Sequence, residues 1–433
     1  MLFDSKINIT FGEMLSEIDF PKMYRIRQQY DSTHIEDVSA AVHREMDCFL
    51  RTQAIRGKRV AITIGSRGIT FYAEIVHALI DSFRAHGALP FLITSMGSHG
   101  GATSEGQVEM ARHLGICAEE LGVEMRSSMD AREVGRLPDG TKVYCAADAL
   151  DADAIFLLNK IKPHADFKGQ NESGLVKMSV IGLGKHIGCS SIHKLGFSRF
   201  AEVLPQACQI ILEKAPVIGG LAIVENSHDM PVLIEAVSKE NLIKRDRELL
   251  VLAKQNIARI RASSLDTLII DEVGKNVSGE GMDPNVTGRP GSELKAGFDF
   301  IQIGCIIVRG VTQISDGNGV GIGMADITTV RCAQSLNLGP MYTNSITAGI
   351  LGPSRLPVVL NNDFEAMKVA IRISAGDHLK APRICWIRNT LALEEMVVSE
   401  AMAQEMLQRK DVSLIGEETL QFDQDNYLIS PFQ

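Results

Sequence analysis

Residues 59–103 read RVAITIGSRGITFYAEIVHALIDSFRAHGALPFLITSMGSHGGAT. Two short apolar runs, Arg59–Ser66 and Leu89–Met96, flank an amphipathic stretch with helical spacing, Phe71–His86. Strands that are buried on both faces are nearly continuous in Val, Ile and Leu, and two such strands joined by a helix run parallel. The segment therefore predicts a strand–helix–strand unit of a parallel sheet.

The same alternation of apolar runs and amphipathic stretches continues along most of the chain. Further strands are expected at Ala154–Leu158, Gly220–Glu225, Leu265–Asp271, Phe300–Arg309, Pro357–Asn361 and Arg383–Arg388. Further helices are expected at Ser104–Leu114, Arg199–Glu213, Glu240–Ile260, Asp326–Ala333, Asp363–Ser374 and Leu393–Gln408. The fold class is therefore expected to be α/β, with mostly parallel sheets flanked by helices.

The length of the chain indicates two domains. It has 433 residues, and domains of about 100–200 residues are the norm. Near residues 257–264 a long polar helical pattern runs into a new strand, which places a boundary there. We expect an N-terminal domain over residues 1–262 and a C-terminal α/β domain over residues 263–433, each with its own sheet.

Composition and charge exclude several classes of protein. The net charge is −9 and the pI is near 5.7, so the basic excess of a nucleic-acid binder is missing. The eight cysteines are scattered without a CxxC pair, which argues against a disulfide framework or a structural zinc site. The N-terminal MLFDSKINITFGEML lacks the pattern of a signal peptide, and no apolar run approaches the ~20 residues of a membrane span. We therefore expect a cytoplasmic protein that binds neither nucleic acid nor membrane.

The segment richest in reactive side chains is Lys160–Arg199, KIKPHADFKGQNESGLVKMSVIGLGKHIGCSSIHKLGFSR. It follows directly on a strand and holds seven Lys and Arg against two acids, a local charge of +5 that leaves −14 for the other residues. Three of the eleven histidines lie in it, His164, His186 and His193. Loops at the carboxyl ends of strands form the ligand crevice of an open α/β sheet. A solvated basic loop is the alternative, but this density of histidine and glycine favours a functional one.

Glycine-rich loops follow other strands. The loop at the end of the expected strand Arg59–Ser66 reads GSRG and contains Ser66 and Arg67. The second loop, at the end of the expected strand Leu89–Met96, reads GSHGGAT and contains His99. The second loop opens a helix whose backbone amides can hold a phosphate, although the GxGxxG and P-loop fingerprints are missing from the sequence. A later loop, Asp316–Gly323, reads DGNGVGIG. A purely structural turn is the alternative for each of these loops.

The arginine, histidines and lysine of these loops would form one reactive site if the strands before them are neighbours in the sheet. Arginine suits a carboxylate or a phosphate. Two histidines on opposite sides of a substrate carbon suit reversible proton transfer near neutral pH. A third histidine with a lysine indicates a metal or a covalently held cofactor. The residues alone predict an anion-binding acid–base enzyme.

The loops also resemble, in the same order, motifs of the nickel-dependent lactate racemase superfamily of 2-hydroxyacid racemases and epimerases. The similarity covers roughly residues 50–330. Ser66-Arg67 corresponds to the threonine–arginine turn of the family. His99 in GSHGGAT and His164 in KPHADF correspond to its two catalytic histidines.

The resemblance implies a cofactor as well. Lys177 and His193 are sixteen positions apart, the separation of the family's cofactor-linking lysine and nickel-binding histidine. The cofactor is a nickel-pincer nucleotide, a pyridinium mononucleotide that Lys177 attaches as a thioamide. His193 completes its square-planar site, where sulfur and imidazole donors suit Ni(II). Ser66, Arg67 and Asp316, the last in a loop similar to the family's DGxGGEG, are the expected cofactor contacts.

The implied reaction is racemisation or epimerisation of a 2-hydroxyacid in the cleft between the two domains. The N-terminal domain binds the cofactor, and the C-terminal domain closes the substrate site. Hydride leaves C2 for the cofactor and returns to either face, while His99 and His164 alternate as base and acid on the hydroxyl group. Arg67 fixes the substrate carboxylate, and Lys275 and Arg289 from the C-terminal domain are expected to bind substrate.

The chain departs from the family at several places. Ile64 stands where the family has an acidic residue three positions before the arginine, and the lysine lies in Gly174-Leu175-Val176-Lys177 instead of GGRK. Lys185, in GLGKH, is therefore a competing attachment site, and the spacing to the nickel-binding histidine favours Lys177 over it. The single tryptophan, Trp386, does not align with the family's substrate-site tryptophan and is expected in the core.

Two other functions fit the same residues. One is a cofactor-free acid–base lyase, dehydratase or isomerase of a sugar acid, which Ile64 and the altered lysine loop favour. The other is a non-catalytic protein that binds an organic anion or a nucleotide, which the local charge of +5 would serve equally well. For the racemase, the expected partners are a small hydroxyacid and the enzymes that make the cofactor, with a homodimer as the default assembly.

Overall fold

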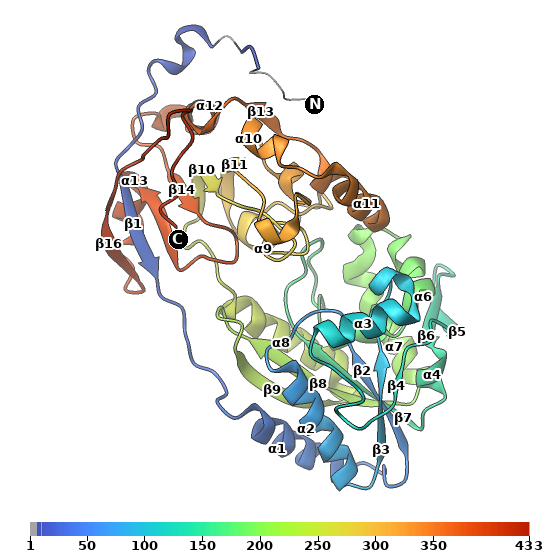
Figure 1. The fold of residues 1–433 in the computed structure, drawn as a ribbon. Coiled ribbons are helices and arrows are strands. Elements are labelled where there is room, and N and C mark those ends of the chain that lie inside the picture. Colours follow the sequence, from blue (N-terminus) through green and yellow to red (C-terminus); the bar gives the residue numbers. More distant parts are fainter. Residues whose placement is uncertain (1–6, 10, 433) are drawn as a thin grey trace. The chain divides into compact units, whose positions relative to one another are not determined.

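The computed structural model describes residues 7–9 and 11–432. The chain forms two compact units, of which one is Asp31–Ile257 and the other joins Met1–Tyr30 to Ala258–Gln433 (Figure 1). A membrane-spanning helix is absent from the described residues, since none combines the necessary length and apolar character.

The two units differ from the predicted domains at the N-terminus. Residues 23–28 were expected to belong to the first domain, but they form the strand β1 (Met23–Gln28), which pairs antiparallel with β15 (Glu395–Ser399) and β16 (Val412–Glu418) of the C-terminal unit. Such long-range pairing leaves no local signal in the sequence. In the N-terminal stretch 1–15, which lacks the pattern of a signal peptide, residues 1–6 and 10 lie outside the described residues.

The first unit is built on a six-stranded sheet with the order β4-β3-β2-β7-β8-β9. Its strands are β2 (Arg59–Ile64), β3 (Leu89–Thr94), β4 (Met125–Arg126), β7 (Ala154–Lys160), β8 (Val217–Glu225) and β9 (Pro231–Ser238). Neighbouring strands run parallel from β4 to β8, and β9 is antiparallel at the edge. The carboxyl ends of β2, β3, β7 and β8 therefore lie along one edge of the sheet.

Helices cover both faces of this sheet (Figure 1). On one face lie α1 (Val38–Leu50) and α2 (Tyr72–Ala85), which pack on side chains such as Phe156. On the other lie α7 (Phe200–Lys214) and α8 (Leu242–Asn256), which pack on neighbours such as Leu157. Successive strand side chains point to opposite faces, which explains why these strands are apolar throughout. The remaining elements are α3 (Ser104–His113), α4 (Ala147–Leu150) and the hairpin of β5 (Ala131–Arg136) and β6 (Lys142–Ala146).

The basic segment after β7 differs from the expected loop. It contains α5 (Leu175–Lys177), a π-helical turn over Met178–Gly182, and α6 (Lys185–His193). Val176 and Ile181 belong to the core on the α7 and α8 side of the sheet. Much of the segment is therefore core structure, and π-helical turns of this kind are frequent at functional sites.

The second unit contains an eight-stranded sheet with the order β13-β12-β11-β10-β14-β15-β1-β16. Its further strands are β10 (Ser264–Ile270), β11 (Gln302–Val308), β12 (Ile327–Thr329), β13 (Val358–Leu360) and β14 (Ile384–Ile387). The five strands from β13 to β14 are parallel, and β15, β1 and β16 add an antiparallel edge. The helices are α9 (Pro284–Thr287), α10 (Val330–Gln334), α11 (Leu338–Ala348), α12 (Asp363–Ser374) and α13 (Glu400–Met406).

Two expected helices of this unit begin as strands. Asp326–Ala333 is β12 followed by α10, and Leu393–Gln408 contains β15 followed by α13. In the first case Thr329 ends the strand and its side chain caps the helix by accepting from the amide of Cys332. The apolar residues continue across each junction, so hydrophobic periodicity alone predicts one helix where a strand is followed by a helix.

Candidate active site

The strand ends of the first sheet bring two predicted residues into direct contact. Ser66 and Arg67 follow β2, and His99 follows the neighbouring strand β3. The hydroxyl oxygen of Ser66 lies 2.6 Å from Nδ1 of His99. Arg67 and His99 are exposed, so both side chains stand where a ligand at this sheet edge can reach them.

His164 follows β7, the other neighbour of β2, and contacts Lys177. Its Nδ1 accepts a hydrogen bond of 3.0 Å from the backbone N–H of Asp166, so the proton of the neutral ring is on Nε2. Nε2 lies 2.7 Å from Nζ of Lys177. A protonated Nε2 needs an acceptor, and a lysine provides one only as a neutral amine. The hydrogen bonds therefore indicate a neutral imidazole against a neutral amine.

Burial lowers the pKa of both members of this pair. Burial, together with the charges of Arg67 and Lys162, lowers the pKa of Lys177 to about 8. Burial and the charge of Lys177 hold the pKa of His164 well below its usual range. Desolvation disfavours the charged form of each group, so the amine at this site is closer to its nucleophilic form than a surface lysine is.

His193 lies at the end of α6 and is oriented by Cys189, one helical turn earlier. Its Nδ1 donates to the carbonyl oxygen of Cys189 at 2.8 Å and lies 3.4 Å from the Cys189 sulfur. The ring nitrogen left for a metal is Nε2, as in metal sites whose histidine donates its other N–H to a backbone carbonyl. Burial raises the thiol pKa and lowers the imidazole pKa, but their mutual contact outweighs it, so the net pKa of Cys189 is lowered and that of His193 is raised.

The aromatic side chain of Phe197 lies between two of the three histidines of this segment. The ring centroid of Phe197 lies 6.0 Å from that of His164 and 5.6 Å from that of His193. Phe167 packs on His164 at 4.5 Å, and Phe200 packs on His193 at 5.0 Å. These rings form an apolar wall that excludes water from one side of both imidazoles.

Glu172 fastens the loop that carries His164. Its carboxylate accepts from the backbone N–H of His164 at 2.7 Å and from that of Gly169 at 3.2 Å. It also pairs with Lys254 at 2.6 Å and Lys168 at 3.4 Å, and its side chain is fully buried. A buried carboxylate with four donors fixes the backbone around it.

Asp246 of α8 holds the short helix α5, which bears Lys177. Its Oδ2 accepts from the amide of Val176 in α5 at 3.2 Å, and its Oδ1 accepts from the Asn171 side chain at 2.9 Å. A Cβ on Gly174 would lie 2.2 Å from Oδ2, so only glycine fits before the helix that bears Lys177. Burial raises the pKa of Asp246 to about 6.

The competing lysine, Lys185, lies in a different environment. It is fully buried, and its Nζ donates to the carbonyl oxygen of Thr94 at 2.6 Å and contacts the Thr94 hydroxyl at 3.2 Å. Burial lowers its pKa to about 8. The contacts that tie Lys185 to the end of β3 are structural, whereas Lys177 contacts a predicted catalytic histidine.

The predicted residues of the C-terminal unit lie at two different edges of its sheet. Lys275 follows β10 and its amide donates to the Ser315 hydroxyl at 3.1 Å, which places it beside Asp316. Arg289 lies at the amino ends of β11 and β12, where it pairs with Asp326 at 2.6 Å and donates to the carbonyl of Ile303 at 3.0 Å. The structure therefore does not bring Arg289 together with Lys275 and Asp316.

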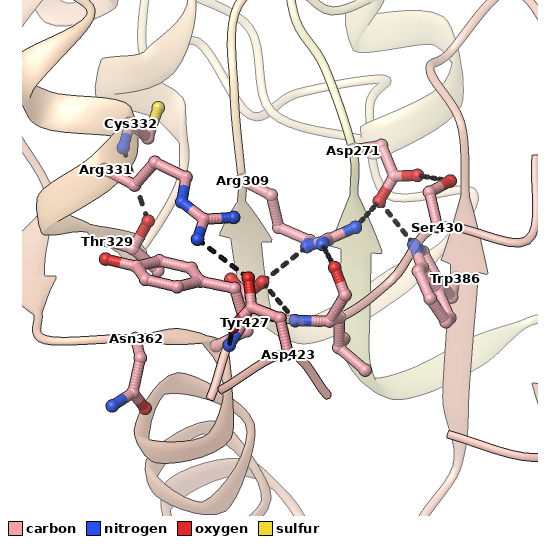
Figure 2. Close-up of polar contacts among 12 residues, drawn as sticks. Asp271, Arg309, Thr329, Arg331, Cys332, Asn362, Trp386, Asp423, Tyr427 and Ser430 are labelled. Carbon is pink, nitrogen blue, oxygen red and sulfur yellow. Dashed lines mark hydrogen bonds and ion pairs between the residues drawn. The ribbon is translucent and has the colours of Figure 1, made fainter. Parts of the chain in front are cut away.

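The carboxyl ends of β10 and β11 are covered by the C-terminal segment of the chain (Figure 2). Arg309 pairs with Asp271 and, at 2.9 Å, with Asp363. The amide of Leu428 donates to the same Asp363 oxygen at 2.8 Å, and its carbonyl accepts from Arg309. Trp386 is in the core, as predicted, and its indole N–H donates to Asp271 at 2.6 Å.

Comparison with solved structures identifies the architecture. The lactate racemase apoprotein from Thermoanaerobacterium thermosaccharolyticum is 17% identical to this chain, with a TM-score of 0.51 over 85% of this chain and 99% of that one. The chain has the lactate racemase fold. A crystal structure of a Thermotoga maritima protein is 14% identical, with a TM-score of 0.49 over 82% of this chain and 97% of the other. No protein-family model and no curated protein sequence matches this chain.

A cofactor that brought its own metal donors would fit the cluster on this lactate racemase fold. Among the described residues, no group of three or more His, Cys, Asp and Glu side chains is arranged to hold a metal ion. His193 offers one imidazole nitrogen, and Lys177, sixteen positions earlier in the chain, offers an amine of lowered pKa. Such a set suits a metal whose remaining ligands come with an organic group that the lysine holds.

The sequence did not reveal three residues that build this site. Cys189 stands four positions before His193, a spacing that places both on one helix face, but the segment was expected to be a loop. Glu172 and Asp246 are ordinary acids in sequence. Their role depends on burial and on partners up to 82 positions away, which no local pattern encodes.

Proposed function

We propose that this protein is a racemase or epimerase of a 2-hydroxyacid that works with a nickel-pincer nucleotide. The observation that carries the proposal is the contact of 2.7 Å between Lys177 Nζ and His164 Nε2, in a cluster that also holds His193. The lactate racemase fold supports it. The protein would depend on the enzymes that make the cofactor, and we expect a cytoplasmic homodimer.

Lys177 and His193 would hold the cofactor. A neutral amine is the form of lysine that can become a thioamide nitrogen, and the Nε2 atom of His193 would be the nickel ligand. Ser66 and Arg67 would contact the nucleotide, where arginine suits its phosphate. When bound, the nucleotide would supply the acceptor that takes the hydrogen of C2 with its electron pair and returns it.

The residues of the chain would bind the substrate and move its protons. Arg67 would fix the substrate carboxylate by paired N–H donors. His99 and His164 would serve opposite enantiomers, each taking the hydroxyl proton in one direction and returning it in the other. Ser66 would keep the His99 ring oriented through its contact at Nδ1.

The test is the intact mass and nickel content of the protein made in a host that also makes the cofactor. We expect a covalent mass increase on Lys177 and about one nickel per chain, the ratio of a single square-planar site. Lys177→Met should remove both, whereas Lys194→Met, at an exposed neighbour of His193, should leave both unchanged. The modified protein should interconvert 2-hydroxyacid enantiomers, and His99→Ala and His164→Ala should each lower that rate at least ~100-fold.

Other outcomes distinguish the competing functions. An unmodified, nickel-free protein from that host would refute the racemase, and turnover of a sugar acid by it would establish the cofactor-free lyase or isomerase. Anion binding that survives alanine at both histidines, without any turnover, would establish a binding protein. An adduct on Lys185 would overturn the assignment of Lys177.

A further inference from the structure

The amine of Lys177 and the imidazole of His164 bond to each other in the protein without cofactor. Nδ1 of His164 accepts from the amide of Asp166 at 3.0 Å, and Nε2 is in contact with the Lys177 amine at 2.7 Å. Both nitrogens of the imidazole are therefore used within the chain. A histidine in this arrangement has no ring nitrogen with which to exchange a proton with a substrate.

We infer that conversion of the Lys177 amine into an amide-type nitrogen is the event that releases His164 for proton transfer. This inference rests on the proposed function, in which the lysine becomes a thioamide. In the protein without its cofactor, both ring nitrogens of His164 would thus stay bonded within the chain and could not exchange a proton with a substrate. Attachment of the cofactor and activation of the histidine would be a single event.

Acylation of Lys177 changes which atom of the pair can accept a hydrogen bond. The lone pair of an amine accepts the Nε2–H of His164, but the lone pair of an amide or thioamide nitrogen is delocalised and does not accept. The N–H that remains after acylation is a donor, and it would face a second donor at Nε2. The ring cannot relieve this by moving its proton to Nδ1, because that atom faces the N–H of Asp166. The contact has to open.

The backbone of His164 is held independently of the Lys177 amine. The amide of His164 is held by the buried carboxylate of Glu172 at 2.7 Å, and the carbonyl of His164 is held by Lys168 at 2.6 Å. Only the side-chain contact to Lys177 depends on the state of the amine.

The test measures the reactivity of His164 at one pH without any turnover. The cofactor-free wild type, Lys177→Gln, Lys177→Met and Lys185→Met are treated with diethyl pyrocarbonate at pH 7.5, and modification of His164 is followed by peptide mass. Glutamine imitates the neutral acylated side chain, methionine removes the nitrogen, and Lys185 is the matched buried lysine, bonded to Thr94 instead of a histidine. We expect His164 to react about tenfold faster in both Lys177 variants, as for the loss of one hydrogen bond, and at the wild-type rate in Lys185→Met.

Equal rates in all four proteins would overturn the inference, as would faster reaction in Lys185→Met alone. If the Lys177 variants do not fold, the modification rate of His164 is compared between cofactor-loaded and cofactor-free wild type. The inference then predicts faster reaction after loading. Loading on Lys177 with an unchanged His164 rate would refute this inference and leave the proposed function intact. Absence of loading would refute the proposed function, and the Lys177 variants would still report on the contact.

Discussion

Nζ of Lys185 lies 2.6 Å from the carbonyl oxygen of Thr94, a residue 91 positions earlier in the chain. The bond joins the first residue of α6 to the last residue of β3, directly before the loop that carries His99. Lys185 has a left-handed φ of 55°, which a non-glycine residue adopts only where the surroundings hold it. A lysine buried at this junction therefore holds the start of α6 to the end of β3.

Lys185→Met is expected to destabilise the first unit. Methionine has a similar length, but it leaves the carbonyl oxygen of Thr94 without its donor. A buried polar group that loses its partner costs about 1–3 kcal/mol of the free energy of unfolding. Urea denaturation followed by circular dichroism measures the loss, and Lys194→Met at an exposed position should match the wild type. Equal stability of the two variants would contradict a structural role for Lys185.

The central strands of both sheets could be predicted because their signal is local. β2, β3, β7 and β8 are apolar on both faces, so each run of Val, Ile and Leu is visible without knowledge of the neighbours. The glycine loops after β2 and β3 are visible for the same reason, and they led to Ser66 and His99, which lie 2.6 Å apart. The strand β1 was missed because its partners are more than 360 positions away.

The rest of the candidate site depends on contacts that the sequence does not encode locally. Leu175–His193 was expected to be a loop because Gly174, Gly182, Gly184 and Gly188 interrupt any helical pattern. In the structure each of these glycines lies where a Cβ would meet atoms at 3.1 Å or less, so they permit the close packing of this segment. Which lysine faces a histidine follows from that packing. Spacing favoured Lys177, and the contact with His164 agrees with it.

Glu172→Gln is expected to loosen the loop that carries His164. The substitution leaves Lys168 and Lys254 without their buried counter-charge, and breaking such a pair typically costs about 3–5 kcal/mol. Hydrogen exchange at residues 164–172 should become faster than in wild type, together with the loss of stability. Glu213→Gln, at an exposed position of α7, serves as the control. Unchanged exchange in residues 164–172 would show that the carboxylate does not hold the loop.

Asp246 is expected to give the protein a stability that rises as the pH falls from 7 to 5. Burial raises its folded-state pKa to about 6 from 3.8. The folded protein therefore takes up a proton before the unfolded chain does, and this contribution is lost as the pH rises through 6. For one such group the gain between pH 7 and pH 5 is about 1 kcal/mol.

The measurement for Asp246 compares wild type with Asp246→Asn, so that other titrating groups cancel. The free energy of unfolding is determined in urea at several values between pH 5 and pH 7. The wild-type advantage over the variant should grow by about 1 kcal/mol as the pH falls. A difference that stays constant, or shrinks toward pH 5, would show that the carboxyl titrates near its ordinary value.

Arg309 is expected to be the main electrostatic support of the second sheet's carboxyl edge (Figure 2). Its side chain is 11% exposed and it pairs with Asp271 and Asp363, which are 12% and 3% exposed. Arg309→Met would leave two buried carboxylates uncompensated, so we expect a loss of about 3–5 kcal/mol. Because Leu428 bonds to both Arg309 and Asp363, the C-terminal segment should detach first.

Arg331 provides the matched control for Arg309, since it lies in the same cluster but its side chain is 53% exposed. Its pairing with Asp423 is solvated, and such pairs contribute little to stability. Arg331→Met should therefore leave the unfolding midpoint nearly unchanged, while Arg309→Met lowers it and makes the chain near Leu428 sensitive to protease. If both variants lost the same stability, burial would not be what distinguishes the two arginines. The coverage of β10 and β11 would then depend on the apolar contacts of the segment, such as Phe432 against Trp386.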